Sequence, residues 1–167
     1  MIKTSISRQS KNRLEIFKSQ AYSIVIDKNS NVTILKWLSF TTSISFRESM
    51  QHAFRIVEEY NTPHLILNAK HFGAIVPNDQ EWSSDLLLEK VKELSLKVLC
   101  IISPTDIFGQ VSIKMMVQNA MKKRLDYNDL KFNYNFKKTN AAVNWIKLLD
   151  LSQKSKATFA TAQTVQM

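Results

Sequence analysis

The chain is poor in cysteine, glycine and proline, and the shortages of cysteine and glycine each exclude a structural feature. Its 167 residues include one cysteine, two glycines and three prolines. A single cysteine, Cys100, excludes an intrachain disulfide and favours a reducing compartment. Two isolated glycines cannot form a glycine-rich phosphate loop, which excludes the Walker and dinucleotide-binding motifs. No apolar run approaches the roughly 20 residues of a membrane-spanning helix.

The first residues lack the apolar stretch of a secretory signal. Together with the single cysteine, this leads us to expect a cytoplasmic protein. Positive charge is abundant: 23 basic and 14 acidic residues give a net charge of +9. Residues 1–20 contribute +4 and residues 151–167 contribute +2. Because the flanks hold most of the excess, we interpret it as solubilising and do not expect a nucleic-acid partner.

The length and the 44% content of hydrophobic residues predict one domain with a substantial core. Residues 1–13 are polar and basic without periodicity, which predicts a flexible arm. Residues 151–167 lack periodicity as well, and we expect a disordered tail there. The folded domain should therefore span residues 14–150.

Five segments carry the patterns of β-strands. Tyr22–Ile26 and Val32–Leu38 flank a polar turn and predict a hairpin. His64–Asn68 and Lys97–Ser103 are nearly continuous apolar runs, typical of parallel strands covered on both faces. Lys131–Phe136 alternates polar and aromatic residues, which indicates an edge strand. Residues 14–17 could add a short extended segment.

Helical periodicity separates these strands. The expected helices are Thr41–Tyr60, Asp79–Leu94, Ile107–Leu125 and a short helix from Thr139 or Asn140. Ser45 and Glu48 would form a capping box on the first helix, and Asn78 or Asp79 would cap the second. In the third helix we expect Val111, Met115, Met116 and Ala120 to be buried, and Ile113 and Val117 are further candidates. The order predicts an α/β domain with a mixed, mostly parallel sheet of about five strands and four helices.

Scattered residues in this order resemble the STAS-type domains of bacterial anti-sigma-factor antagonists, and more closely the SpoIIAA-like (STAS/SEC14-type) proteins of uncertain function. The matching positions are Trp37 at the end of the hairpin, Leu65-Ile66-Leu67-Asn68, Pro77 to Trp82, Val98 to Pro104, Asp106-Ile107-Phe108-Gly109, Phe132, and Ala141 to Trp145. The resemblance covers about residues 15–150. It implies a STAS-like fold and a regulatory role through protein docking.

The sequence departs from that family at one functional position. Classical anti-sigma antagonists have a phosphorylatable serine after the strand that corresponds to His64–Asn68. Here the segment is Asn68-Ala69-Lys70-His71, which has no hydroxyl group, and Ser83 and Ser84 lie inside the next helix. The resemblance therefore implies partner docking by the helix 79–94, through residues such as Asp79, Trp82 and Asp85, without the phosphorylation switch.

Polar residues follow two neighbouring strands of the predicted sheet. Lys70 and His71 follow one strand, and Ser103, Thr105 and Asp106 follow the next. Because ligands bind beyond the carboxyl ends of parallel strands, this group could bind an anion or transfer protons. Such positions are also commonly filled by caps and turns, and we prefer that interpretation. We do not expect an enzyme.

Other chemistry finds little support. His52, His64, His71 and Cys100 lack the spacing of a zinc site, and we expect no metal or cofactor. Cys100 lies in an apolar strand and should have a raised pKa. The leading hypothesis is a non-enzymatic regulatory or protein-interaction module. The alternative is a small-ligand or lipid-binding domain that uses the same strand ends and a methionine-rich helix, with Met115, Met116 and Met121, although methionines at helical spacing are commonly core residues.

Overall fold

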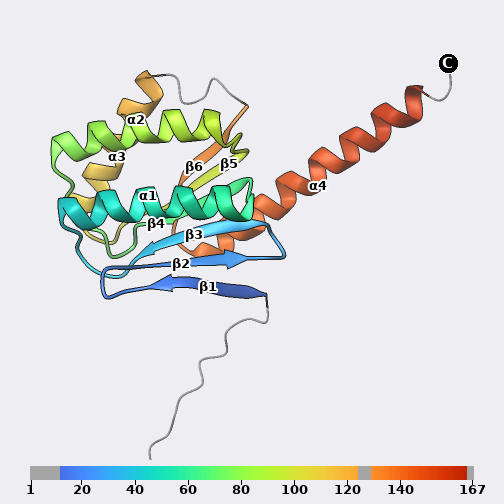
Figure 1. The fold of residues 1–167 in the computed structure, drawn as a ribbon. Helices are drawn as coiled ribbons and strands as arrows, with labels where there is room; N and C mark the ends of the chain where they lie inside the picture. Colours follow the sequence, from blue (N-terminus) through green and yellow to red (C-terminus); the bar gives the residue numbers. More distant parts are fainter. Residues whose placement is uncertain (1–11, 124–128, 165–167) are drawn as a thin grey trace, which may run out of the picture.

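The computed structural model describes the backbone of residues 12–123 and 129–164 and the side chains of these residues as far as residue 157. The described chain forms a six-stranded sheet and four helices (Figure 1). In chain order these are β1 (Arg13–Lys18), β2 (Tyr22–Asp27), β3 (Val32–Trp37), α1 (Ser43–Tyr60), β4 (His64–Asn68), α2 (Pro77–Glu93), β5 (Val98–Ile102), α3 (Ile107–Lys122), β6 (Lys131–Phe136) and α4 (Thr139–Thr164).

The strands lie in the sheet in the order in which they occur in the chain. β2 is antiparallel to both of its neighbours, β1 and β3, whereas β3, β4, β5 and β6 are parallel. The expectation of an α/β domain with a mixed, mostly parallel sheet and four helices is confirmed. The predicted strand count was one too low, because residues 14–17 belong to a complete edge strand, β1. The predicted arm, residues 1–13, lies almost wholly outside the described residues.

Two hydrophobic cores lie on opposite faces of the sheet. Side chains of α1, α2 and α3 pack with Leu35, Leu65 and Leu67 on one face. Of the described helices, α4 alone packs with Val32, Ile34 and Ile66 on the other (Figure 1). Because successive side chains of a strand point to opposite faces, strands covered on both sides are apolar throughout. This explains why β5 is a continuous apolar run.

Two of the helix starts differ from the predicted ones. Thr42, not Ser45, caps α1, and its Oγ1 accepts the backbone N–H of Ser45. α2 begins at Pro77, and its N-cap residue, Val76, makes no capping bond through its side chain. Pro77 favours this early start because it lacks the N–H that would otherwise need a partner. The carboxylate of Asp79 is then free to contact α1.

The third helix buries four of the six residues named for its core and exposes the other two. Ile113, Met116, Val117 and Ala120 are buried, whereas Val111 and Met115 are exposed. Apolar residues occupy almost the whole circumference of α3, so the sequence does not single out the face that packs against the sheet. As a result, α3 presents an apolar stripe to the outside.

The last helix is much longer than expected. The disordered tail predicted from residue 151 is wrong for residues 151–164, because α4 continues to Thr164 and extends beyond the body of the protein (Figure 1). The segment contains no proline or glycine after residue 139, and its alanine, lysine and glutamine residues favour a helix without any apolar stripe. Periodicity therefore could not reveal it.

His64 connects α4 to the sheet. Its ring is 2% exposed, and its Nε2 lies 3.2 Å from Asp150 Oδ2. Its Nδ1 is buried and has no partner among the described residues. Burial lowers the pKa of His64, an effect that Lys97 adds to and that Asp150 opposes. The neutral ring therefore donates its Nε2–H to Asp150.

This lowered pKa predicts a pH dependence of stability. The unfolded chain binds a proton at His64 near pH 6.5, whereas the native state resists it to a lower pH. Stability should therefore fall as the pH drops from about 6.5 through the native pKa. We expect urea unfolding to show this loss in the wild type and a flatter profile in His64→Gln. His71→Gln, on an exposed loop, is the control, and an equal flattening in that variant would contradict the assignment.

Candidate functional site

The carboxyl ends of β3, β4, β5 and β6 lie at one end of the sheet, where all four helices begin. We call this end the strand-end rim. It consists of residues 38–44, 69–76, 103–111 and 137–138. In open parallel sheets this is where ligands bind, and most of the polar residues predicted from the sequence lie here.

One hollow of the strand-end rim brings four predicted residues together. Its volume is about 300 Å³, and it is lined by Leu38, Ser39, Phe40, Lys70, His71, Thr105 and Asp106. The backbone N–H and Oγ1 of Thr105 both donate to the carbonyl of Lys70, at 3.1 and 3.0 Å. Asp106 accepts the backbone N–H of Gly109 at 2.8 Å and caps α3. Thr105 therefore joins two loops and Asp106 caps a helix, so that of these four residues only Lys70 and His71 present free, exposed side chains.

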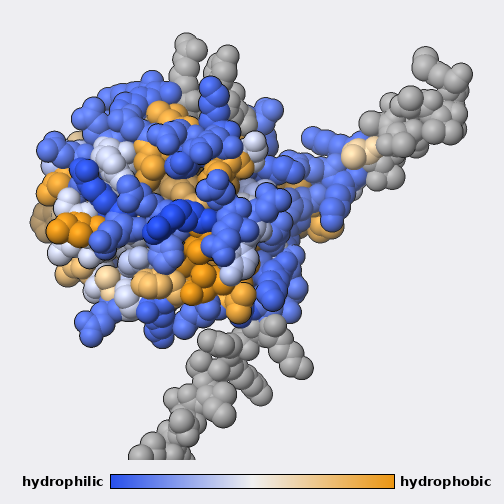
Figure 2. All heavy atoms as spheres, in the orientation of Figure 1, coloured by the Kyte–Doolittle hydropathy of each residue, from blue (hydrophilic) through white to orange (hydrophobic). Residues whose placement is uncertain are grey.

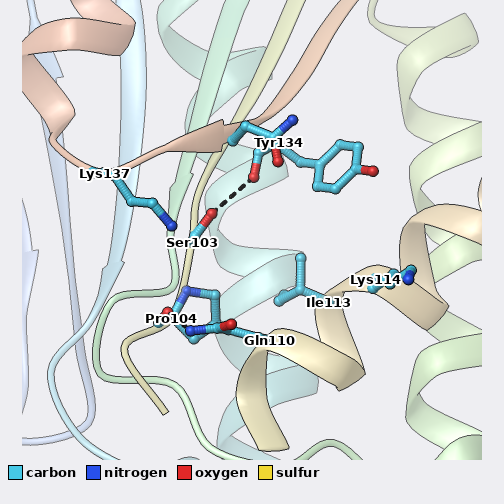
Figure 3. Close-up of a pocket in the computed structure, with 8 residues that line it drawn as sticks. Ser103, Pro104, Gln110, Ile113, Lys114, Tyr134 and Lys137 are labelled. Carbon is cyan, nitrogen blue, oxygen red and sulfur yellow. Dashed lines mark hydrogen bonds between the residues drawn. The ribbon is translucent and has the colours of Figure 1, made fainter. Parts of the chain in front are cut away.

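Ser103 lines a different hollow, which lies between α3 and β6 and has a volume of about 200 Å³ (Figure 3). Its hydroxyl donates to the carbonyl of Tyr134 at 3.0 Å. Figure 3 shows the amino group of Lys137 pointing towards Ser103, while the ring of Tyr134 points away. No histidine or carboxylate is among the described residues that line this hollow, so Ser103 has no base beside it and is not arranged as a nucleophile.

Asp79 and Trp82 belong to a cluster between α1 and α2. The Asp79 side chain is buried, and its carboxylate accepts the Arg47 Nε–H at 2.7 Å and the Ser43 hydroxyl. The Arg47 guanidinium also lies 4.9 Å from the centre of the Trp82 ring. Such an arrangement fixes the two helices and orients the indole. Asp79 is thus a positioning residue that a partner cannot reach.

A groove runs between α1 and α2. Its volume is about 500 Å³, and it is lined by Gln51, Phe54, Arg55, Glu58, Trp82, Leu86, Glu89, Lys90 and Leu94. Four of these residues, Phe54, Trp82, Leu86 and Leu94, are apolar, and Figure 2 shows hydrophobic residues in this region surrounded by hydrophilic ones. The sequence identified Trp82 but missed the wall that α1 provides. Asp85 is not part of this groove, and its carboxylate instead pairs with Lys123 at 2.6 Å.

The charge of the two groove helices is opposite to that of the chain. α1 and α2 together contain eight acidic and four basic residues, a net charge of −4. The whole chain has a net charge of +9. Within the groove, the Lys90 amino group is held by Glu93 at 2.5 Å and by Glu89 at 3.5 Å. The outer residues of α1 and α2 therefore form an acidic surface on a basic protein, whereas the four charged residues that line the groove itself, Arg55, Glu58, Glu89 and Lys90, balance one another.

The methionines and the cysteine have separate environments. Met116 is buried, whereas Met115 and Met121 are exposed. Cys100 is buried, which raises the pKa of its thiol to about 12, in agreement with the prediction. In the described part of the chain, no group of three or more metal-ligating side chains could hold a metal ion. No helix over the same residues is both long and apolar enough to cross a membrane.

Comparisons with known proteins identify no relative. No family model, curated protein or solved structure matches the chain. The class that the fold itself defines is an α/β protein in which three helices cover one face of a six-stranded sheet and one long helix covers part of the other.

Proposed function

We propose that this protein is a non-enzymatic interaction module that binds a basic, amphipathic helix of a partner protein in the groove between α1 and α2. The observation that carries the proposal is the groove itself, in which an apolar floor lies between two helices of net negative charge. An amphipathic helix bound in an apolar groove is a recurrent mode of peptide recognition.

The floor of the groove has the residue types that dominate binding energy. Trp82, Leu86 and Leu94 are only partly buried by the protein's own core, so a partner could cover the rest of their surface. The indole of Trp82 is already held by Arg47, which lowers the entropy that binding would cost. Partly exposed aromatic residues in concave sites are typical hot spots.

The charge of the surrounding helices favours a partner of a particular kind. Glu58 and Glu89 line the groove together with Arg55 and Lys90, and the excess of negative charge comes from further acidic residues along the two helices, which carry a net charge of −4. A cationic partner would be attracted to this surface, whereas an acidic one would be repelled. The partner helix should therefore have leucine-like residues on one face and lysine or arginine at its edges.

The resemblance to STAS-type anti-sigma antagonists gives the proposal a second support. In that family, the helix corresponding to α2 and the loop before it dock the partner protein. This chain has Asn68-Ala69-Lys70-His71 in place of the phosphorylated serine motif. The regulation we propose therefore acts by binding alone, without phosphorylation at this loop.

A pair of peptides tests the proposal. One is an 18-residue helix of leucine and lysine with its leucines on one face, about as long as α1, and the other replaces every lysine by glutamate. Titration calorimetry should show binding of the lysine peptide that weakens with added salt, and no binding of the glutamate peptide. Equal binding of both peptides, or binding of neither, would refute a cationic helix as the partner.

A further inference from the structure

The exposed apolar side chains of this protein are concentrated at one end. Among the described residues, twelve large hydrophobic side chains are exposed, and six of them lie on the strand-end rim. These six, each more than half exposed, are Phe40, Ile44, Val76, Ile107, Phe108 and Val111. Met115 follows one helical turn beyond Val111. Exposed apolar surface gathered in one place marks an interaction site.

Close backbone contacts place these side chains beside one another. A Cβ atom on Gly73 would lie 2.6 Å from the Phe40 ring, so the ring rests directly on this glycine. A Cβ atom on Gly109 would lie 2.4 Å from the carbonyl of Phe72 and 3.3 Å from that of Gly73. The Phe40 ring and the first turn of α3 therefore pack against the same short loop, and fixed elements rather than long side chains present the apolar surface.

The charged groups of the strand-end rim are mainly basic. Lys70, Lys137 and Lys138 are exposed in its loops, and Lys114 is exposed on α3 just beyond it. Its one carboxylate, Asp106, caps α3, and Asp79, three residues beyond the rim on α2, pairs with Arg47. The next acidic residues along α1 and α2, Glu48 and Glu81, lie one turn beyond Ile44 and Pro77. The strand-end rim thus combines exposed apolar side chains with exposed lysines.

We propose that the strand-end rim binds the surface of a lipid bilayer that contains anionic lipids. Phe40 protrudes from the connection between β3 and α1, Ile107 and Phe108 protrude from the first turn of α3, and all three are 62–72% exposed, which suits shallow insertion among headgroups better than the lining of a protein interface. The lysines around them would contact lipid phosphates and carboxylates. The strand-end rim therefore matches a bilayer surface both in its apolar groups and in its charge. Because its charge is positive, it should bind an anionic bilayer more tightly than a neutral one.

This inference is independent of the proposed function. The groove lies between the flanks of α1 and α2 and reaches Leu94, beyond the end of α2 that is remote from the rim. A bilayer at the strand-end rim would leave that part of the groove open to a partner. Substitutions in the groove should therefore affect peptide binding alone, and substitutions in the strand-end rim should affect vesicle binding alone.

Vesicle co-sedimentation of the full chain tests the inference. The wild type should bind vesicles of phosphatidylcholine with about 30% phosphatidylserine, and it should bind phosphatidylcholine alone at least roughly tenfold more weakly. The double variant Ile107→Ser, Phe108→Ser should bind the anionic vesicles at least about tenfold more weakly than the wild type. Serine is well tolerated at the start of a helix, so this variant should fold.

Two control variants sharpen the result. Leu148→Ser with Leu151→Ser removes two leucines that are 65% and 60% exposed on α4, away from the rim, and should bind vesicles like the wild type. Lys137→Gln with Lys138→Gln should weaken binding roughly thirtyfold, whereas Lys28→Gln with Lys147→Gln should weaken it much less. Equal losses in the rim and control variants would overturn the inference, as would failure of the wild type to bind anionic vesicles.

The competing occupant of the rim is a second copy of the chain. Light scattering after gel filtration distinguishes the two cases without lipid. A wild-type dimer that becomes a monomer in Ile107→Ser, Phe108→Ser would assign the apolar surface to self-association and overturn the membrane proposal. A monomeric wild type that binds anionic vesicles supports it.

Discussion

Replacing Leu86 by lysine should reduce the affinity of the protein for the leucine–lysine peptide about a hundredfold. Leu86 lies in the floor of the groove and is only partly buried, so a lysine there can extend to solvent without disrupting the fold. The variant loses an apolar contact in the centre of the site and places a positive charge against a cationic ligand. Titration calorimetry measures the change directly.

The matched control for this variant is Leu148→Lys. It introduces the same charge at a leucine of α4 that is remote from the groove, and it should leave the affinity for the peptide within about twofold of the wild-type value. A second variant, Glu58→Lys with Glu89→Lys, reverses the charge at the walls without altering the floor. It should weaken binding mainly at low salt. If Leu86→Lys and Leu148→Lys bound the peptide equally well, the groove would not be the binding site.

Replacing Gly109 by alanine should destabilise the protein by about 2–3 kcal/mol. The added Cβ would lie 2.4 Å from the carbonyl oxygen of Phe72 and 2.9 Å from the Cβ of Pro104. Neither atom can be moved by a change of side-chain rotamer, so α3 must shift away from the loop. The better helix propensity of alanine offsets at most about 1 kcal/mol of this cost. Urea unfolding gives the difference in free energy.

Gly73→Ala provides the comparison. Its Cβ would meet only the ring of Phe40, which is exposed and can rotate away. The native conformation of Gly73 does not require a glycine, because no described glycine has a positive φ angle. We expect a change in stability of less than about 1 kcal/mol. Equal destabilisation by the two substitutions would show that α3 is not in backbone contact with this loop.

The strands were predictable because their patterns follow from burial. His64–Asn68 forms β4 with its predicted bounds, since an apolar run of this length fits a strand covered on both faces. Lys131–Phe136 forms an edge strand, as its alternation indicates. Local composition determines these elements, and tertiary contacts only place them in order.

The helix ends and faces were less predictable because several residues could serve equally well. Thr42 and Ser45 both suit an N-cap, and the sequence does not show which hydroxyl faces the free N–H groups. Apolar residues all around α3 left its buried face undetermined. The long α4 has no amphipathic stripe in its second half, although its composition favours a helix. Tertiary contacts determine the start of α1 and the buried face of α3, and intrinsic helix propensity determines the length of α4. The hydrophobic pattern alone does not fix any of these.

The candidate site, like the fold, was predictable only in part. Lys70, His71, Thr105 and Asp106 meet at one hollow because the carboxyl ends of adjacent parallel strands must meet. Ser103 points into a second hollow, a difference of side-chain direction that composition does not encode. The groove forms only where α1 and α2 lie side by side. No local sequence pattern in α1 indicates that its outer residues face α2, so the groove could not be predicted.

The most direct test of the central proposal is a map of where the leucine–lysine peptide binds. Two-dimensional ¹⁵N–¹H spectra of the labelled full chain, recorded during titration, would locate the perturbed amides. We predict that the largest shifts fall in α1 and α2 around Phe54, Trp82 and Leu86, and that they vanish in Leu86→Lys. Shifts centred instead on the strand-end rim, around Lys70, Ile107 and Lys137, or spread evenly over the acidic surface, would contradict a partner site in the groove.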